Sequence, residues 1–429
     1  MTLIEKSHPP LEGGSKFALS ESEKEISGRG DAPATPLPEA GFALSREVAF
    51  DPPSRGGLRA DARLSVSHLR LTNFRSYASV EMATRGVPVV LAGPNGAGKT
   101  NLLDAISLLS PGRGLRGARL SEHTRRGPSA MSEALWAVAA TVSRAGEAYE
   151  IGTGLVSAQG SERRQVRMNG AAAQSSADLG DVVQMLWLTP AMDRLFIESA
   201  SGRRKFLDRL VLGFDAGHAR MATRYETAMR ERARLLKFGP RDPAWLDGLE
   251  AEMVEAGIAM AAARVETVAR LNLALEERVG AFPAAQLSLE NDIDPETLRE
   301  YLARARIRDA EAGRTTVGPH LTDLTVRHTQ KRTDARECST GEQKALLISI
   351  VLADARELSR ARAGLSPLLL LDEIAAHLDV TRRAALFGEV LELGAQAWMT
   401  GTDIEMFAPL AGKAQLFEVA DSQPRLISE

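Results

Sequence analysis

Regular hydrophobic patterns begin near residue 64 and continue through most of the chain. Residues 64–71 alternate between apolar and polar side chains, which predicts a strand. Between about 199 and 275, apolar residues recur at helical spacing with Arg and Glu dense between them, which predicts long helices. Further strands are expected at 80–82, 87–92, 134–143, 148–155, 164–169, 185–188, 324–326, 368–371 and 395–400, and further helices at 101–109, 342–360 and 381–393. This order predicts an α/β fold that carries an inserted α-helical domain.

These patterns divide the chain into four parts. Residues 64–195 and 313–429 are expected to form the two halves of one α/β domain, with the helical domain, 196–312, inserted between them. Residues 1–63 differ, because the first 60 hold seven Pro and seven Gly among Ser and charged residues. Such a segment buries too little apolar surface to offset its ordering entropy, so we expect disorder. It is a partner-binding tail, a dispensable extension, or the product of a start site assigned too far upstream.

Composition narrows the class of protein. Hydrophobic residues make up 44% of the chain and charged residues 25%, as in globular proteins. No apolar run is long enough for a transmembrane helix, and the N-terminus lacks the apolar centre of a secretory signal. The single cysteine, Cys338, excludes an intrachain disulfide and a four-cysteine zinc site, so we expect a cytoplasmic protein. The net charge of −3 argues neither for nor against nucleic acid, so any DNA contact requires a local basic surface.

A glycine-rich loop stands between the strand at 87–92 and the helix at 101–109. It fits G-x-x-x-x-G-K-[ST] without a mismatch. Glycines let backbone N–H groups converge on phosphate oxygens, and the positive end of the helix dipole points at the same anion. Lys99 is expected to reach the β- and γ-phosphates of a nucleotide, and the Thr100 hydroxyl to ligate Mg²⁺. The loop consists of Gly93, Pro94, Asn95, Gly96, Ala97, Gly98, Lys99 and Thr100.

Two adjacent carboxylates, Asp372 and Glu373, end the apolar run at 368–371. An Asp at the end of a buried strand beside a phosphate loop can hold Mg²⁺, directly or through water. The adjacent Glu can act as the general base that polarises the attacking water. Runs of Leu followed by acids are common, so the pair indicates a nucleotide site only in combination with the phosphate loop upstream. The sequence therefore predicts a nucleoside triphosphatase in which Lys99 and Glu373 are catalytic.

The residues that open the helix at 342–360 have two interpretations. Ser339 or Thr340 suits a helix N-cap, with Glu342 in the first turn. The run 339–343 also resembles S-G-G-Q, the signature of ABC-type ATPases, and lies shortly before the acidic pair as in those proteins. That resemblance implies that Ser339, Gly341 and Gln343 approach the γ-phosphate bound by a second protomer, so that ATP drives homodimerisation. It also places Asp379 at the dimer face, although Asp379 equally suits an N-cap of the next helix.

Further segments are similar to motifs of the RecF family of DNA replication and repair proteins. Residues 69–77 resemble L-x-x-F-R-x-Y, and 315–320 resemble T-x-x-G-P-H. Residues 188–195 and 201–208 resemble the two halves of P-x-x-[ED]-L…P-x-x-R-R-x-[FL]-L-D. The resemblance covers about 64–402 in the order of the family, and it implies that Asn73 and Arg75 lie against the nucleotide.

The chain departs from the RecF pattern at several positions. The R-D-D-L that follows G-P-H is replaced by the residues at 321–324, so an Arg and an Asp are absent. Ala200 or Ser201 stands in place of the Pro of P-x-x-R-R. Thr400 and its neighbours stand where many ABC ATPases have a switch histidine, and Gln184 is the candidate for the Q-loop glutamine. We therefore expect slow ATP hydrolysis.

The resemblance implies both a fold and a function. The fold is an ABC-type P-loop ATPase head, with mixed sheets and flanking helices, joined to a helical domain, and similar to SMC heads without the long coiled coil. The function is ATP-dependent binding of single-strand/duplex junctions and gaps by a weak, DNA-stimulated ATPase of the nucleoid. RecF proteins act with RecO and RecR to help load RecA in recombinational repair and the SOS response. Another SMC-like DNA-repair ATPase and a transporter subunit are the rivals, and the long helical insert argues against the transporter.

The helical region holds the candidate DNA surface. Residues 203–241 contain eleven Lys or Arg against four acids, an excess of seven positive charges. In a dimer, two such arms could form a positive cleft over the phosphate backbone. A solvated helix face is the alternative, and Arg203 and Arg204 could instead pair with acids at the domain interface. No aromatic platform for bases is apparent, so we expect recognition of backbone and shape. The candidate DNA contacts are Arg220, Arg224, Arg230, Arg234 and Lys237.

Overall fold

The computed structural model describes residues 63–126, 135–158, 161–239, 242–276, 280–290 and 297–429. The segment expected to be disordered, 1–63, lies outside these residues except for Arg63. Within the described chain, every strand and helix expected from the hydrophobic pattern is present, with ends shifted by a few residues.

The central sheet has six strands in the order β15-β14-β3-β13-β12-β8. All neighbouring pairs are parallel except β14 and β15. Carboxyl ends of parallel strands meet at one edge, so the loops after β3, β8, β12 and β13 lie together there. The strands are β3 (Val89–Ala92), β8 (Met185–Leu188), β12 (Leu368–Leu371), β13 (Ala397–Gly401), β14 (Gln415–Ala420) and β15 (Gln423–Ser428).

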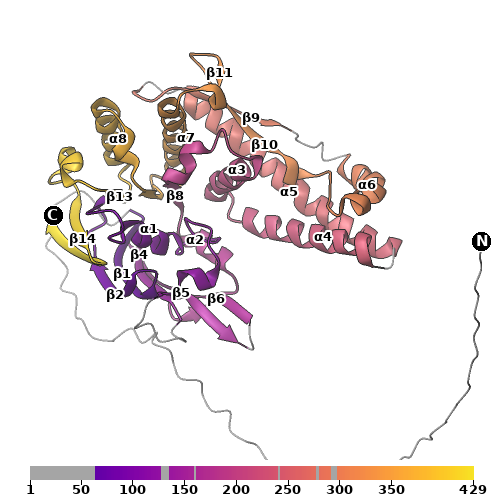
Figure 1. Ribbon diagram of the computed structural model, residues 1–429, viewed down its shortest axis with the longest axis horizontal. Coiled ribbons are helices and arrows are strands. Elements are labelled where there is room, and N and C mark those ends of the chain that lie inside the picture. Colours follow the sequence, from indigo (N-terminus) through magenta and orange to yellow (C-terminus); the bar gives the residue numbers. More distant parts are fainter. Residues whose placement is uncertain (1–62, 127–134, 159–160, 240–241, 277–279, 291–296) are drawn as a thin grey trace, which may run out of the picture. The chain divides into compact units, whose positions relative to one another are not determined.

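Helices cover both faces of the central sheet. Figure 1 shows α7 (Thr340–Ala361) and α8 (Val380–Leu393) on one side and α1 (Lys99–Ser107) on the other. The alternation of side chains along a strand explains this arrangement. In β12, Leu369 and Leu371 belong to the core that includes α7, whereas Leu368 and Leu370 belong to the core that includes α1.

An antiparallel sheet packs beyond α1. Its strands follow the order β2-β1-β4-β5-β6-β7, and β1 shares the core of α1 through Leu69 and Leu71. The short helix α2 (Leu179–Val182) leads from this sheet to β8. The strands are β1 (Ser65–Phe74), β2 (Tyr77–Ala83), β4 (Ala137–Arg144), β5 (Glu147–Ala158), β6 (Ser161–Met168) and β7 (Ala171–Ala172).

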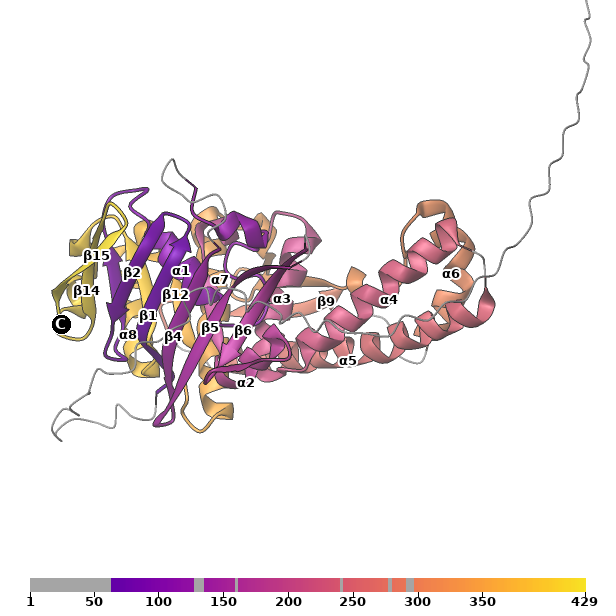
Figure 2. The ribbon, with the colours of Figure 1, turned by 90° about the horizontal axis from the view of Figure 1, so that it is seen from below.

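The helical region consists of α3 (Ala200–Phe214), α4 (His218–Phe238), α5 (Pro243–Glu276) and α6 (Leu298–Ala312). Figure 2 shows α4, α5 and α6 packed together to one side of the sheets, and we call these three helices the arm. Strand β9 (Ala285–Glu290), which the sequence pattern did not predict, returns from α5 and pairs with β10 (Asp323–His328). A third sheet, β11-β10-β9, thereby joins the end of α5 to the segment that leads into α7, with β11 at Thr333–Asp334.

Among the α-helices and strands of the described chain, those that the sequence did not predict are α2, α6, β7, β9, β11, β14 and β15. Five of the six residues of β15, an edge strand, are solvent-exposed, so its hydrophobic pattern carries little signal. Among the residues that the structure places, none of the helices combines the length and the hydropathy that a bilayer crossing requires.

Candidate nucleotide site

The glycine-rich loop joins β3 to α1 at the carboxyl edge of the central sheet. Gly93 has a φ of 153°, and a Cβ there would lie 2.2 Å from the carbonyl oxygen of Val419 on β14. Gly98 has a φ of 110°, and a Cβ there would lie 2.7 Å from the Tyr77 hydroxyl. Both positions therefore require glycine for conformational and steric reasons. No side chain caps the N-terminus of α1, so its first amides can serve an anion.

Lys99 points into this loop. The side chain is only 4% exposed, and Nζ donates to the carbonyl oxygens of Gly93 at 2.7 Å and Pro94 at 2.9 Å. Burial lowers the pKa of Lys99, while the nearby carboxylates of Glu373 and Asp372 act in the opposite direction. The ammonium therefore lies between the loop and the acidic pair, where the phosphates of a nucleotide would be held.

Asp372 lies opposite Thr100, as the sequence predicted for a shared magnesium site. Its Oδ1 accepts from the Thr100 hydroxyl at 2.9 Å and from the Thr400 hydroxyl at 2.8 Å. Burial raises the pKa of Asp372, and the two hydroxyl hydrogen bonds oppose that shift. No group of three or more His, Cys, Asp or Glu within the described chain could hold a metal. One carboxylate and one hydroxyl, completed by phosphate oxygens and water, nevertheless form the hard oxygen set that Mg²⁺ prefers.

Glu373 occupies a strained position next to this pair. Its φ is 49°, in the left-handed region, and its backbone N–H donates to the Thr400 hydroxyl at 2.8 Å. The Thr400 hydroxyl therefore holds both acids, donating its proton to Asp372 and accepting from the backbone N–H of Glu373. Strain in a non-glycine residue persists where surrounding contacts over-determine it, and such residues concentrate at functional sites.

Asp379 and Ser339 both act as helix caps. Asp379 accepts from the Arg382 backbone N–H at 2.8 Å and caps α8, so the capping interpretation is confirmed. Ser339 caps α7 in a capping box, in which its N–H donates to the Glu342 carboxylate at 3.0 Å. A contact with Lys331 is the main cause that lowers the pKa of Glu342 to about 2, so this carboxylate stays charged.

The signature residues divide into an exposed and a buried set. Ser339 and Gly341 are exposed, and a Cβ on Gly341 would meet no atom within 4 Å. Gln343 instead turns inward, where its amide donates to the Cys338 carbonyl at 2.8 Å. Within the described residues, no hydrogen bond or ion pair joins this helix start to the glycine-rich loop. Ser339 and Gly341 are thus available to a second molecule, while Gln343 supports the turn beneath them.

Asn73 lies near the end of β1 and Arg75 lies in the turn that leads to β2, both with positive φ. The Arg75 guanidinium donates to Asp104 on α1 at 3.0 Å. Burial alone would raise the pKa of Asp104, but contacts with His123 and Arg75 bring it below its ordinary value. Arg75 is thus largely engaged in fixing the strand turn to the loop helix.

A cavity of about 500 Å³ opens beside this turn and contains residues that sequence reasoning missed. Arg116 is one of them, and its charge lies close enough to Asp372 to oppose the rise of that pKa. The segment around Arg116 carries no hydrophobic period, and only the fold brings it to α1, so the sequence held no signal for it. The lining residues are Arg75, Ser76, Asn101, Arg116, Glu122, Thr124 and Arg126.

Gln184 does not lie at the nucleotide site, so its interpretation as the Q-loop glutamine is wrong. It precedes β8, and its carbonyl accepts from the Leu368 N–H at the amino end of β12. Because β8 and β12 are parallel, Gln184 and Asp372 stand at opposite edges of the sheet. Its buried amide donates to the Gly180 carbonyl at 2.6 Å, which indicates a structural role.

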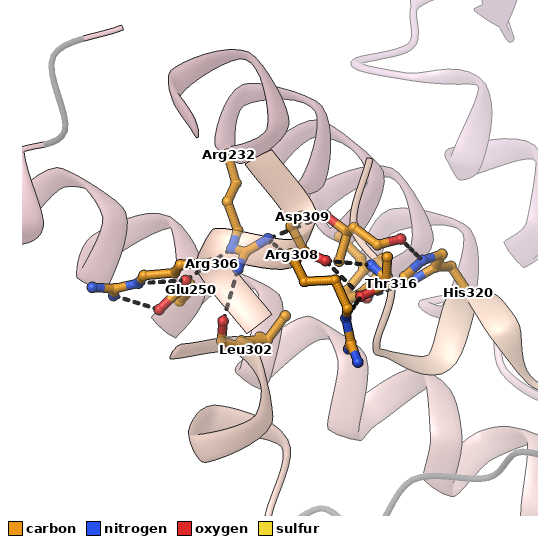
Figure 3. Close-up of polar contacts among 10 residues, drawn as sticks. Arg232, Glu250, Leu302, Arg306, Arg308, Asp309, Thr316 and His320 are labelled. Carbon is orange, nitrogen blue, oxygen red and sulfur yellow. Dashed lines mark hydrogen bonds and ion pairs between the residues drawn. The ribbon is translucent and has the colours of Figure 1, made fainter. Parts of the chain in front are cut away.

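The arm presents fewer free positive charges than the sequence count suggested. Arg220, Arg230, Arg234 and Lys237 are exposed on α4, whereas Arg224 binds Glu252 and Glu255 of α5. Figure 3 shows Arg232 and Arg306 converging on Glu250, which is 3% exposed. Acids of α5 and α6 therefore neutralise part of the excess of positive charge counted over residues 203–241. Arg203 pairs with Asp323 at 2.7 Å, as the alternative interpretation of that residue held.

Comparisons with known proteins agree with this architecture. Residues 65–423 match the family described as the RecF/RecN/SMC N terminal domain. The chain is 50% identical over 373 residues to "DNA replication and repair protein RecF" of Rhizobium etli (strain CIAT 652), covering 84% of this chain and 98% of that protein. It is also 50% identical over 370 residues to the protein of that name from Agrobacterium fabrum, covering 83% and 97%.

Solved structures show the same fold. A structure described as the recombination mediator protein RecF with ATPrS, in the RecFOR pathway, superposes with a TM-score of 0.73 at 21% identity, covering 86% of this chain and 100% of that one. The Smc head domain of Pyrococcus furiosus superposes with a TM-score of 0.50 at 18% identity, covering 85% and 96%. The expected fold class, a P-loop ATPase head of mixed sheets and flanking helices, is therefore confirmed.

Proposed function

The chain belongs to the RecF family of DNA replication and repair proteins, and we propose that it is an ATP-driven dimeric clamp for gapped DNA. The observation that carries the proposal is the convergence of Lys99, Thr100 and Asp372 at the carboxyl edge of the central sheet. Lys99 and Thr100 are adjacent in the chain, Asp372 lies 272 residues after Thr100, and together the three suit a triphosphate and a divalent cation.

Each residue of the site has a defined task in this proposal. Loop amides and Lys99 bind the β- and γ-phosphates and offset the charge that develops as the γ-phosphoryl group leaves. Asp372 and Thr100 would hold Mg²⁺, which when bound would supply positive charge to the phosphates. Glu373, oriented through Thr400, accepts a proton from the attacking water. Hydrolysis is slow, since Thr400 stands where many ABC ATPases have a histidine.

A second copy completes the site. Ser339 and the N-terminus of α7 are exposed and positioned by the capping box, so they can approach the γ-phosphate bound by the partner. Two ATP molecules then join two protomers, and the paired arms enclose duplex DNA next to a single-stranded gap. Exposed cations of α4 contact the phosphate backbone without reading bases.

Family membership supports the biological setting that we propose. We place the protein at the nucleoid in the cytoplasm, where it acts in replication, recombinational gap repair and the SOS response. RecR and RecO are its expected partners, and loading of RecA is the expected outcome. Another SMC-like DNA-repair ATPase remains the alternative function.

The test measures mass and DNA binding together. Mass photometry with and without ATP reports dimerisation, and fluorescence anisotropy of a labelled gapped duplex at fixed moderate salt reports binding. Wild type should dimerise and bind more tightly with ATP. Lys99→Met should lose both responses, and Glu373→Gln should remain dimeric because ATP persists. A Glu373→Gln protein that stays monomeric in saturating ATP would overturn the shared site.

A further inference from the structure

Within the part of the chain that the structure describes, no hydrogen bond or ion pair joins the T-x-x-G-P-H motif to the nucleotide site, and its surroundings indicate a different role. It belongs to residues 315–323, which run from α6 to the start of β10 and which we call the connecting segment. Contacts from four helices hold it: α3, α4, α5 and α6. Few loops are held from so many sides, because connecting segments usually run over the surface.

The first contact is ionic and comes from the arm. Arg232 of α4 is fully buried and donates to Asp309 at 2.6 Å and to the Thr315 hydroxyl at 3.4 Å (Figure 3). Asp309 in turn accepts from both the N–H and the hydroxyl of Thr316, at 2.9 and 2.6 Å. A buried charge without its partner is strongly destabilising, so the start of the connecting segment must move with α4 and α6.

The second contact is a relay through His320. Its Nδ1 lies 2.9 Å from the Tyr225 hydroxyl of α4, and its Nε2 lies 3.1 Å from the Thr315 carbonyl oxygen. Burial lowers the pKa of His320, so the ring is neutral. One tautomer satisfies both partners: Nε2–H donates to the carbonyl, and Nδ1 accepts from the tyrosine.

The third contact fixes the centre of the segment. Arg264 of α5 donates to the Pro319 carbonyl at 2.6 Å and forms a fork with Asp208 of α3 at 2.8 and 3.0 Å. Gly318 has a φ of 133°, and a Cβ there would lie 2.1 Å from the Tyr225 hydroxyl. The glycine of the motif is therefore required by the close approach of the arm tyrosine.

The other end of the connecting segment leads to α7, the helix that Ser339 caps. Arg203 of α3 donates to both carboxylate oxygens of Asp323 at 2.9 and 2.7 Å, the aspartate that this chain keeps where the family has R-D-D-L. Asp323 begins β10, and the turn after β10 carries Lys331, which donates to Glu342 in the first turn of α7. Glu342 holds the N–H of Ser339 through the capping box. A path made of side-chain contacts and the backbone between them thus runs from Tyr225 to Ser339.

We propose that the connecting segment is the positioning device through which the arm sets the position of Ser339. The proposal rests on the proposed function, in which DNA lies against the arms and Ser339 engages the partner's nucleotide. DNA that displaces or steadies α4 and α5 would move residues 315–323, and the β10 turn would carry that movement to the start of α7. Tyr225, Arg264 and His320 are positioning residues in this scheme and touch neither ATP nor DNA.

Hydrogen exchange of the full chain, without ATP or DNA, tests the path independently of the proposed function. Tyr225→Phe removes only the hydroxyl, and Arg264→Lys keeps the charge but loses the fork. In both variants the amides of residues 335–345 should exchange about tenfold faster than in wild type, as expected for the loss of one buried hydrogen bond. Arg306→Gln is the matched control, because it breaks arm pairs with Asp247 and Glu250 without touching the connecting segment.

Two results would overturn the proposal: faster exchange confined to α4–α6, or an equal effect in Arg306→Gln.

Turnover provides the second readout. Tyr225→Phe and Arg264→Lys should retain wild-type affinity for a fluorescent ATP analogue but lose DNA stimulation of kcat by about fivefold or more, the lower range of allosteric coupling. If DNA stimulates kcat as strongly in both folded variants as in wild type, the proposal is also wrong. Failure of wild type to dimerise with ATP would instead reject the proposed function and leave the exchange result valid.

Discussion

The hydroxyl of Thr100 donates to the carboxylate of Asp372 at 2.9 Å, although 272 residues separate the two in the chain. Thr100 is the second residue of α1 and Asp372 directly follows β12, so the contact joins the two halves of the α/β domain. The Thr400 hydroxyl reaches the same oxygen at 2.8 Å and also holds the N–H of Glu373. Two threonines thus donate to the same carboxylate oxygen, and they should have separable roles.

Thr100→Val should weaken nucleotide binding in a magnesium-dependent way. A ligand to Mg²⁺ is lost, so affinity for a fluorescent ATP analogue should fall by about tenfold or more with Mg²⁺ and stay near wild type in EDTA. Thr400→Val serves as the matched variant, since it should lower kcat more than affinity by releasing Glu373. Equal losses in Mg²⁺ and EDTA for Thr100→Val would show that the hydroxyl has no metal role.

Alanine substitutions at two glycines should distinguish an effect on folding from an effect on contact with the second protomer. Gly93→Ala places a Cβ 2.2 Å from a backbone oxygen of β14, so it should destabilise the head by about 1–3 kcal/mol and abolish nucleotide binding. Gly341→Ala meets no atom within 4 Å, so its melting temperature should match wild type. If ATP-driven dimerisation is nevertheless lost in Gly341→Ala, the added methyl group clashes with the second protomer. Differential scanning fluorimetry and mass photometry make the comparison, and an unaltered dimer would exclude close contact at Gly341.

Asp354 should make stability fall as the pH rises. It is completely buried on α7, and neither carboxylate oxygen has a hydrogen-bond partner within the described chain. Burial, with a smaller contribution from Glu357, raises the pKa of Asp354 well above its ordinary value. A raised folded-state pKa gives stability that is complete below the unfolded pKa, about 3.9, and lost as the pH climbs toward the folded value.

Asp354→Asn removes this ionisation. The free energy of unfolding of wild type, measured in urea, should decline more steeply from pH 5 to pH 8 than that of the variant. At pH 8 the variant should be more stable by about 1–3 kcal/mol, because it has no buried carboxylate to ionise and each unit of pKa shift corresponds to about 1.4 kcal/mol. Parallel pH profiles for the two proteins would mean that Asp354 does not titrate in this range.

The exposed cations of α4 should contribute to DNA affinity, and Arg224 should contribute less. Gln at Arg220, Arg234 or Lys237 should weaken binding of a gapped duplex regardless of sequence and reduce the salt slope of log K by about 1 each. Arg224→Gln should change the slope little, because Glu252 and Glu255 already engage that guanidinium. Anisotropy titrations at several salt concentrations measure the slopes. Unchanged slopes at all four positions would move the DNA contact away from the arm.

The sequence predicted individual elements well where they depend on residues that are close together in the chain. Gly93 and Gly98, the Leu run of β12 and the cap at Ser339 each depend on neighbours within a few residues, and all lie where the pattern placed them. Gln184 was misplaced because a glutamine before a strand carries no information about which sheet edge it occupies. Arg224 was predicted to be a DNA contact for the same reason, because the acids that neutralise it lie on a different helix, α5.

By itself, the sequence determined the phosphate loop, the acidic pair, the α/β class with its helical insertion and the family resemblance, because these follow from residue type at short spacing. Only the tertiary structure decided which residues meet across long separations: Thr400 with Asp372, Arg116 with the acidic pair, and Tyr225 with His320. It also decided which charges remain free. Long-range contacts arise from packing of whole sheets and helices, and no local pattern encodes the partner that packing brings to a given side chain.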